Sequence, residues 1–193
     1  DRWLPDWAGL WMIVMKSSGD HPWPWGAAAT EAEAKAIFAR EYPSLHRHLK
    51  RFESYVDAKT GKRAGLRHRE DQGRWWWELR PCAYYDAFAR PRTFYNDITW
   101  SSSFSIDHEE RYTNNTGYFL PSADPVLAAV LNAPVGWWYA WRRAQHGKDE
   151  ALRYFTSFVE QYPIPAFSAE AVDRIGEGVG ALAEGINDDR NHA

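Results

Sequence analysis

The 193-residue chain has one cysteine, Cys82, so it cannot form an internal disulfide. It has no run of about 18 apolar residues and no charged leader followed by an apolar stretch, which argues against membrane insertion and secretion. These absences predict a cytoplasmic protein. The chain begins with Asp1 and not with Met, and we expect it to be a piece cut from a longer polypeptide.

Catalytic motifs are also missing. The sequence has no phosphate-binding glycine loop, no Cys or His pairs at zinc spacing and no nucleophile elbow. Asp71 with Glu78-Leu79-Arg80 only faintly echoes the acidic pattern of magnesium-dependent nucleases, because the spacing is too short and Arg80 stands where lysine is wanted. The Asn-Pro-Pro-Tyr type of motif expected of an amino methyltransferase does not occur. The chain alone is therefore predicted to be non-catalytic, with no metal ligands and no cofactor of its own.

Aromatic residues are abundant, with 12 Trp, 10 Tyr and 9 Phe, and 45% of the chain is hydrophobic, which indicates a globular protein. Three of the tryptophans are consecutive in Gln72–Arg80. We interpret Trp75 to Leu79 as a central strand, since three consecutive tryptophans can all be sheltered in a strand that is covered on both faces. The expected fold is α+β, with a central mixed or antiparallel sheet of five or six strands flanked by helices.

Apolar patterning and turn residues place the other elements. The further strands are expected at residues 10–15, 93–100, 104–106 and 117–120. Helices are expected at residues 30–40 behind a Thr30/Glu33 capping box, from Pro43, from Asp124-Pro125, through Trp137 to Arg143, after Phe155, and from Ser168. In the helix from Pro43, Leu45, Leu49, Phe52 and Val56 follow one face, which is expected to be buried. The opposite face carries Arg47, His48, Lys50 and Arg51, as a solvated surface or as the edge of a DNA-facing one.

The formal net charge of −3 is distributed unevenly. Residues 42–92 hold 12 Lys and Arg against 6 Asp and Glu, a net of +6, whereas residues 1–41 hold 4 against 6 and residues 93–193 hold 7 against 14. A basic segment within an acidic remainder is typical of nucleic-acid binding, although an ordinary solvated surface is the alternative.

The densest cations lie in the loop at residues 57–74, which leads into the tryptophan run. A long basic loop on a rigid strand presents donors to phosphates and base edges. We predict that DNA is contacted by Lys62, Arg63, Arg67, Arg69, Gln72 and Arg74. Among these, Arg67, Arg69 and Arg74 are the expected readers of guanine. If they are not, the turn around Arg111 to Asn115 is the next candidate.

Several segments occur in the order known from one family. They are Gln72–Arg80, Arg90-Pro91-Arg92 before a strand, Asn114-Asn115-Thr116 with Tyr118-Phe119, the apolar helix ending Leu131-Asn132, and Tyr162-Pro163-Ile164-Pro165. Over residues 42–167 the chain thereby resembles the TaqI-like C-terminal specificity domain. That family forms the target-recognition part of adenine-specific DNA methyltransferases, including restriction-modification enzymes with a fused endonuclease.

The resemblance implies that residues 1–167 form a DNA target-recognition domain and that residues 168–193 are a C-terminal helical extension. Double-stranded DNA and a methyltransferase domain of the same polypeptide are the implied partners, with S-adenosylmethionine bound by that other domain. Arg90 and Arg92 are then expected to contact phosphates, and Asn114 to bond an adenine edge or to shape a turn. The alternative is an aromatic-rich carbohydrate-binding or protein-interaction module.

Overall fold

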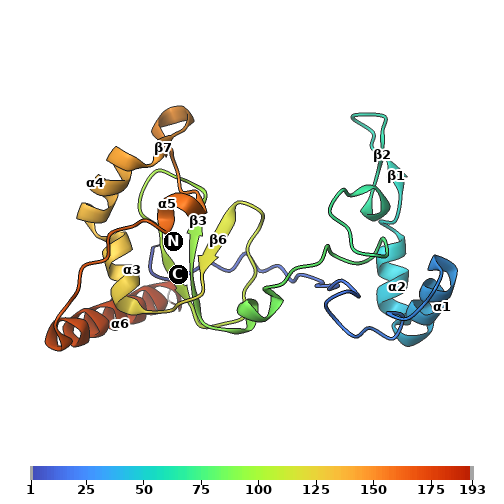
Figure 1. Ribbon diagram of the computed structural model, residues 1–193, viewed down its shortest axis with the longest axis horizontal. Coiled ribbons are helices and arrows are strands. Elements are labelled where there is room, and N and C mark those ends of the chain that lie inside the picture. The colour runs from blue at the N-terminus through green and yellow to red at the C-terminus, as the bar shows by residue number, and fades with distance from the viewer. Residues whose placement is uncertain (1, 192–193) are drawn as a thin grey trace. The chain divides into compact units, whose positions relative to one another are not determined.

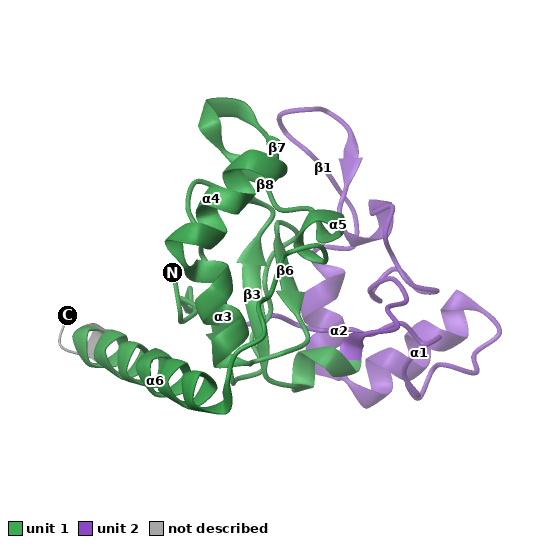
Figure 2. Ribbon diagram, turned by 60° about the vertical axis from the view of Figure 1, so that its left-hand side comes forward, with its two compact units in different colours: residues 1–10, 86–193 green, residues 11–85 purple. Residues whose placement is uncertain are grey.

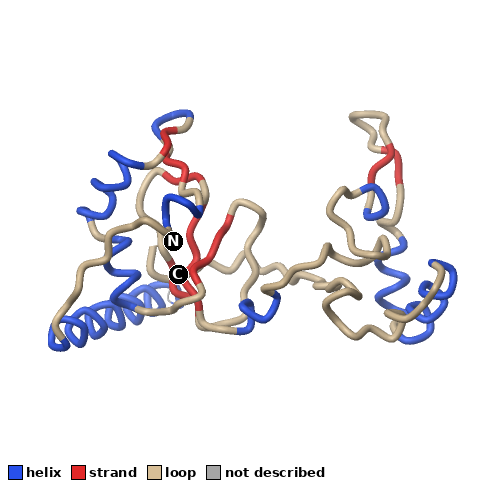
Figure 3. The backbone as a smooth tube through the Cα atoms, in the orientation of Figure 1, coloured by secondary structure: helices blue, strands red, loops and turns tan. Residues whose placement is uncertain are grey.

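The computed structural model describes residues 2–191 and the side chains as far as residue 189. The chain divides into two compact units, which Figure 2 colours separately: unit 1 comprises residues 1–10 and 86–193, and unit 2 comprises residues 11–85. Helices are combined with small antiparallel sheets, and long stretches have no regular structure (Figure 3). The mixed α and β class predicted from the sequence is confirmed. None of the described helices is long and apolar enough to cross a membrane.

Unit 2 is built on two adjacent helices, α1 (Glu31–Glu41) and α2 (Pro43–Lys50), which begin where predicted. The second is shorter than predicted, because Phe52 and Val56, expected on its buried face, lie beyond its end and are 47% and 66% exposed. The Thr30 hydroxyl accepts a hydrogen bond from the Glu33 N–H at 3.2 Å, which satisfies a donor that the first turn of α1 leaves unpaired. Pro43 starts α2, where its missing N–H costs nothing. A short hairpin follows, β1 (Tyr55–Val56) with β2 (Arg63–Ala64), and then the 3₁₀ turn η1 (Leu66–His68).

The three consecutive tryptophans do not form a strand, and this prediction is wrong. Trp75, Trp76 and Trp77 lie in a tight loop that is closed by a single bridge between Gln72 and Leu79. All three rings are nevertheless buried in the same core, with Trp25 and Phe38.

The loop holds its shape because the fully buried Glu78 carboxylate ties it to the preceding chain. This carboxylate accepts hydrogen bonds from Trp25 Nε1 at 2.8 Å and from the Ser18 N–H and hydroxyl and the Arg74 N–H, each at 3.1 Å. The Ser18 and Arg74 N–H groups and the Trp25 indole therefore find their acceptor in a side chain and not in a sheet, whereas the indole N–H groups of Trp75, Trp76 and Trp77 have no partner among the described residues.

The strand predicted at residues 10–15 is also absent. This segment leads from unit 1 into unit 2 and joins no ladder. Leu10 is 77% exposed and Trp11 88%, whereas Met15 is buried and its carbonyl accepts the Leu79 N–H at 2.7 Å. The apolar run indicated burial, but in the described chain only its last residue is buried.

Unit 1 contains two three-stranded antiparallel sheets and not one sheet of five or six strands. The first has the order β5-β3-β6, with β3 (Arg92–Asn96) between β5 (Ser105–Asp107) and β6 (Gly117–Leu120). Figure 1 labels β3 and β6 of this sheet. The second has the order β4-β8-β7 and is formed by β4 (Ile98–Thr99), β7 (Gln145–His146) and β8 (Leu152–Arg153).

The strand predicted at residues 93–100 is divided at Asp97. The Asp97 N–H donates to the Thr116 carbonyl beside β6, whereas the Asp97 carbonyl accepts the Tyr154 N–H beside β8. Its carboxylate also accepts hydrogen bonds from Arg153 Nε at 2.9 Å and Nη2 at 2.6 Å. The chain therefore changes sheets at this residue.

The helices predicted in unit 1 are confirmed. They are α3 (Pro125–Asn132), α4 (Pro134–Arg143), α5 (Thr156–Val159) and α6 (Ala169–Asn191), with further 3₁₀ turns at η2 (Tyr85–Ala89), which begins in unit 2, and η3 (Lys148–Glu150). Asp124 caps α3, and its carboxylate accepts the Val126 N–H at 2.8 Å. Val179 of α6 is buried in a cluster with Ala128 of α3 and Ile106 of β5, so α6 belongs to the packed body of unit 1.

Candidate nucleic-acid interface

Arg67, one of the predicted guanine readers, is bound to two carboxylates within unit 2. Its Nη1 donates to Glu31 at 3.0 Å, and its Nη2 lies 2.7 Å from Glu53. The hydrogen bonds to Glu31, and next those to Glu53, raise the pKa of the Arg67 guanidinium above its usual value. The guanidinium also lies over the Trp76 ring, 5.8 Å from its centroid. Arg67 therefore ties η1 to α1 and to the segment after α2.

Arg69 and Arg74 are similarly occupied. Arg69 donates to the carbonyls of Glu78 at 2.8 Å and Leu66 at 3.2 Å. Arg74 donates to the Ala28 carbonyl at 2.8 Å and stacks over Trp75 at 4.7 Å. Gln72 makes a hydrogen bond to the Arg67 carbonyl at 3.4 Å. The described conformation uses these side chains to hold the tryptophan loop, so their placement gives base reading by them no support.

Arg92 lies in unit 1 and is fully buried. Its guanidinium pairs with the buried Asp107 carboxylate at 2.9 Å and donates to backbone carbonyls, including Glu109 at 2.9 Å and Arg111 at 2.8 Å. No surface of Arg92 remains for a phosphate, so the phosphate contact expected of it does not fit this conformation. Arg90, by contrast, is exposed.

Asn114 shapes a turn before β6. Its side-chain oxygen accepts the Thr116 N–H at 3.1 Å and the Thr116 hydroxyl at 2.7 Å, which is the geometry of an Asx turn. Of the two roles expected of Asn114, the structure shows this one.

Six exposed cations of unit 2 lie on α2 and on the hairpin, while Arg40 on α1, Arg74 and Arg80 are exposed elsewhere in the unit. Arg47 and Lys50 lie on α2 three residues apart, and Arg51 directly follows its last residue. We call this set the α2 basic face. Lys59, Lys62 and Arg63 are exposed on the hairpin. None of the six has an ion pair with another residue of the described part of the chain.

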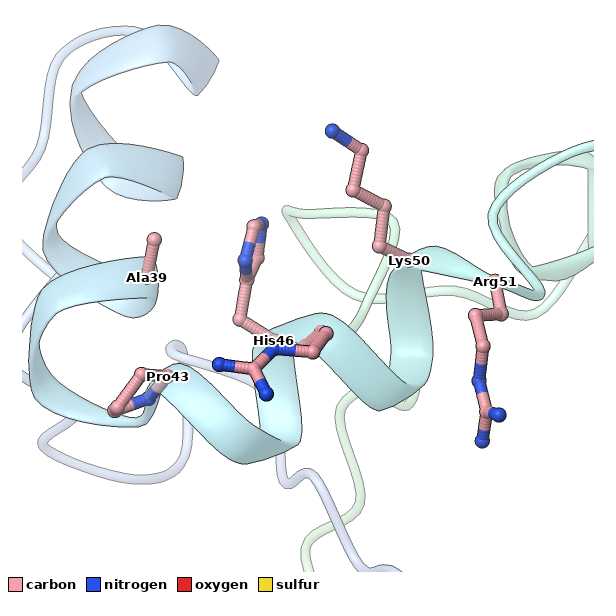
Figure 4. Close-up of a pocket in the computed structure, with 6 residues that line it drawn as sticks. Ala39, Pro43, His46, Lys50 and Arg51 are labelled. Atoms are coloured by element: carbon pink, nitrogen blue, oxygen red, sulfur yellow. The ribbon is translucent and has the colours of Figure 1, made fainter.

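A hollow of about 500 Å³ lies beside the α2 basic face. It is lined by Ala39, Pro43, His46, Arg47, Lys50 and Arg51, none of which is acidic. A second hollow of about 250 Å³ shares Arg47 and Arg51 with the first. Figure 4 shows that His46 and Lys50 rise on the same side of α2, whereas Arg51 extends in another direction from the end of the helix. A concave surface with cations and no carboxylate suits an anion.

The surroundings of His46 disfavour its protonated form. Its pKa is lowered, mainly because the ring is partly desolvated and also because Lys35 and Lys50 are near. The ring packs edge-on against Phe38 with centroids 5.4 Å apart, and Nε2 is buried without a hydrogen-bond partner among the described residues. At neutral pH the charge of the hollow therefore comes from Arg47, Lys50 and Arg51.

The charge asymmetry along the sequence persists between the two units. Unit 2 holds 13 Lys and Arg against 9 Asp and Glu, a net of +4, and unit 1 holds 10 against 17, a net of −7. The sequence-based site included Lys62 and Arg63, but it omitted Arg47, Lys50 and Arg51. The spacing of these three cations was visible in the sequence. The sequence did not show that Arg67 is paired with Glu31 and Glu53 while these three have no carboxylate partner in the described part of the chain.

Comparison with known proteins gives no assignment for this chain: no protein-family model matches it, and no curated protein matches it. The residues that the structure describes contain no group of three or more His, Cys, Asp or Glu side chains that could hold a metal ion.

Proposed function

We propose that this chain is a DNA-binding module that positions a target site for an adenine methyltransferase domain of the same polypeptide. The observation that carries the proposal is the set of exposed cations without carboxylate partners on α2 and the hairpin, next to a hollow that no acidic residue lines. Such a surface is an electrostatic footprint for the phosphate backbone. The order of segments that resembles the TaqI-like specificity domain supports the methyltransferase context, and a fused endonuclease belongs to the same context.

In this proposal the chain reads DNA and the chemistry takes place elsewhere. S-adenosylmethionine would be bound by the catalytic domain, because the sequence has no methyltransferase motif. The purified chain should therefore transfer no methyl group from labelled S-adenosylmethionine to DNA. Methyl transfer by the chain alone would contradict this half of the proposal.

The binding half is tested with the full 193-residue chain and a duplex of mixed sequence. We expect a Kd of about 10⁻⁴ to 10⁻⁶ M at physiological salt, the range of non-specific binding to duplex DNA. Each phosphate contact should also contribute about −0.9 to the slope of log K against log salt. The double variant Arg47→Gln/Lys50→Gln should weaken binding to all sequences alike. It should also make the slope shallower by about two units if both residues contact phosphates.

The matched control is Arg142→Gln/Arg143→Gln in α4, which removes the same charge from an exposed helix of acidic unit 1. This control should keep the wild-type affinity and slope. Equal losses in the two double variants would show only a response to net charge, and absence of duplex binding by the wild-type chain would refute the proposal.

The protein-interaction alternative is favoured by one observation, a group of exposed aromatic residues on α4. Trp138 is 57% exposed and Trp141 40%, and Val135 beside them is 69% exposed. The carbohydrate alternative rests on the many tryptophans of the chain: Trp75, Trp76 and Trp77 are buried, whereas Trp11, Trp100 and Trp138 are exposed. Substituting Trp138 with Ala should leave DNA binding unchanged if α4 serves another partner, and a loss of DNA affinity would place α4 within the DNA interface instead.

A further inference from the structure

The hairpin β1–β2 carries almost no packing within its own unit. From Ser54 to Arg63 only Asp57 is partly buried, and Tyr55 and Val56 are 51% and 66% exposed. The hairpin leaves the C-terminal end of α2 and extends away from α1 and α2, as both Figure 1 and Figure 2 show. An isolated two-stranded hairpin is marginally stable in water, so this one needs other constraints to keep its shape.

Those constraints are present at the tip. The Asp57 carboxylate accepts the N–H groups of Lys59 at 3.0 Å and Thr60 at 2.7 Å, together with the Thr60 hydroxyl at 2.9 Å. The backbone closes the same turn, because the Asp57 N–H donates to the Lys62 carbonyl at 2.9 Å and Gly61 donates to the Asp57 carbonyl at 2.8 Å. Gly61 takes a positive φ of 67°, which glycine adopts without strain.

The root of the hairpin is fixed in a different way. The Leu66 and Arg67 N–H groups donate to the carbonyls of Phe52 at 2.8 Å and Glu53 at 3.0 Å. Gly65 lies so close to this backbone that an added Cβ would meet the Phe52 carbonyl oxygen at 2.7 Å. Arg67 adds its ion pair with Glu53. The hairpin is therefore an exposed, pinned projection on the core of unit 2.

The register gives the hairpin one face suited to base edges. Val56 pairs with Arg63, and Tyr55 pairs with Ala64, so Arg63 and Val56 lie on one face and Tyr55 and Ala64 on the other. The Arg63 side chain makes no hydrogen bond or ion pair with any residue in the described part of the chain. The N–H donors of its guanidinium are therefore available. An arginine fork matches the O6 and N7 acceptors of guanine, and an apolar side chain beside it can contact a thymine methyl group.

The dimensions also fit. The major groove is about 12 Å wide and about 8.5 Å deep, and it admits a two-stranded ribbon whose strands lie about 4.8 Å apart. At about 3.3 Å per residue, the two residues of each strand span about 7 Å, and the turn at residues 57–62 extends the hairpin beyond them. Helix α2 has only eight residues, packs one side against α1 and lies at the root of the hairpin, where the DNA backbone would pass.

We propose that the β1–β2 hairpin enters the major groove of duplex DNA and that Arg63 reads a guanine there, while the α2 basic face contacts flanking phosphates. This inference rests on the proposed DNA-binding function and deepens it. It moves base reading from Arg67, Arg69 and Arg74, whose donors hold the fold, to an arginine whose donors are free. Lys59 and Lys62 at the turn would accompany Arg63 as phosphate contacts on either wall of the groove.

The test is selection from a randomised duplex pool by the full chain in three forms: wild type, Arg63→Ala, and Arg47→Ala as the matched control from α2. Wild type should enrich sequences with a fixed guanine. In Arg63→Ala the preference at that position should fall by about 5- to 150-fold, the discrimination of one bidentate contact, with the other positions kept. Arg47→Ala should select the same sequences as wild type and bind all of them more weakly.

A second measurement identifies the groove. In a selected duplex, replacing that guanine with 7-deazaguanine removes the N7 acceptor from the major groove. The replacement should weaken wild-type binding and leave the binding of Arg63→Ala unchanged. Because Arg63 is exposed, the Ala variant should keep the wild-type fold, which circular dichroism checks.

Three outcomes overturn the inference while the proposed DNA binding stands: duplex binding without any base preference, the same preference in Arg63→Ala as in wild type, or indifference of the wild type to 7-deazaguanine. A wild-type chain that does not bind duplex DNA at all refutes the proposed function itself.

Discussion

Both units contain structural arginines and exposed ones, but the units differ in net charge, −7 in unit 1 and +4 in unit 2. In unit 1, Arg92 is fully buried against Asp107, and Arg153 pairs with Asp97 at the point where the chain changes sheets. In unit 2, some arginines hold loops, but others remain on the surface without carboxylate partners. The comparison shows that the density of cations along a sequence does not identify a binding surface. The partners that each guanidinium finds in the fold decide whether it is structural or free to bind.

Removing the most deeply buried arginine should have the largest effect. Arg92→Ala leaves the Asp107 carboxylate buried with only Arg111 as an ionic partner, so we expect a loss of about 3–5 kcal/mol in the free energy of unfolding of unit 1. Hydrogen exchange of the β3 and β5 amides measures it separately from unit 2. The exposed neighbour is the control, and Arg90→Ala should change the stability by less than about 0.5 kcal/mol. If Arg92→Ala were equally harmless, the structural role given to unit 1 arginines would be wrong.

A glycine at the root of the hairpin should matter next. Gly65 has a φ of 112°, a region open essentially to glycine alone, and its Cβ position is blocked by backbone. Gly65→Ala should therefore cost about 1–3 kcal/mol in unit 2 and loosen the hairpin. Gly61→Ala should cost less, because an added Cβ there meets nothing within 4 Å. Amide exchange at Leu66 and Arg67 is the measurement, and equal protection in the two variants would mean that the hairpin is not pinned at this root.

The smallest effect concerns pH. Because the pKa of His46 is lowered in the folded state, this histidine takes up a proton more readily in the unfolded state as the pH falls. The free energy of unfolding should therefore be higher above the ordinary pKa of 6.5 and should decrease below it. Urea unfolding of unit 2 at pH 7.5 and 5.5 should show a decrease at the lower pH that is smaller in His46→Gln. The other histidines provide a background common to both proteins. An unchanged decrease in the variant would remove His46 as the cause.

Local signals predicted the helices well. Thr30 with Glu33, Pro43, Asp124-Pro125 and Ser168 each mark a helix start through capping groups or a fixed φ, and these effects act within one turn of the chain. The strand of residues 117–120 was also found by its pattern. The candidate site was found only in part, because Lys62 and Arg63 were included while the α2 basic face was left as one of two possibilities.

Longer-range interactions account for the failures. Trp75 to Trp77 were expected in a strand because burial on both faces was the only local way to shelter three rings. The fold instead buries them in a loop, because Glu78 reaches back to Ser18 and Trp25, some 60 and 53 residues away in the chain. A contact between residues so far apart in the chain cannot be predicted from the local pattern of apolar residues.

The sequence by itself determined where helices begin, that the tryptophan run is buried, and that the middle of the chain is basic, since these depend on neighbouring residues and composition. Tertiary structure alone decided which cations are paired within the fold and which have no partner there. Arg67 finds Glu31 across 36 residues of chain and Arg92 finds Asp107 on the adjoining strand, whereas Arg63 finds no carboxylate in the described part of the chain. An ion pair depends on distance in space, and folding alone brings those groups together.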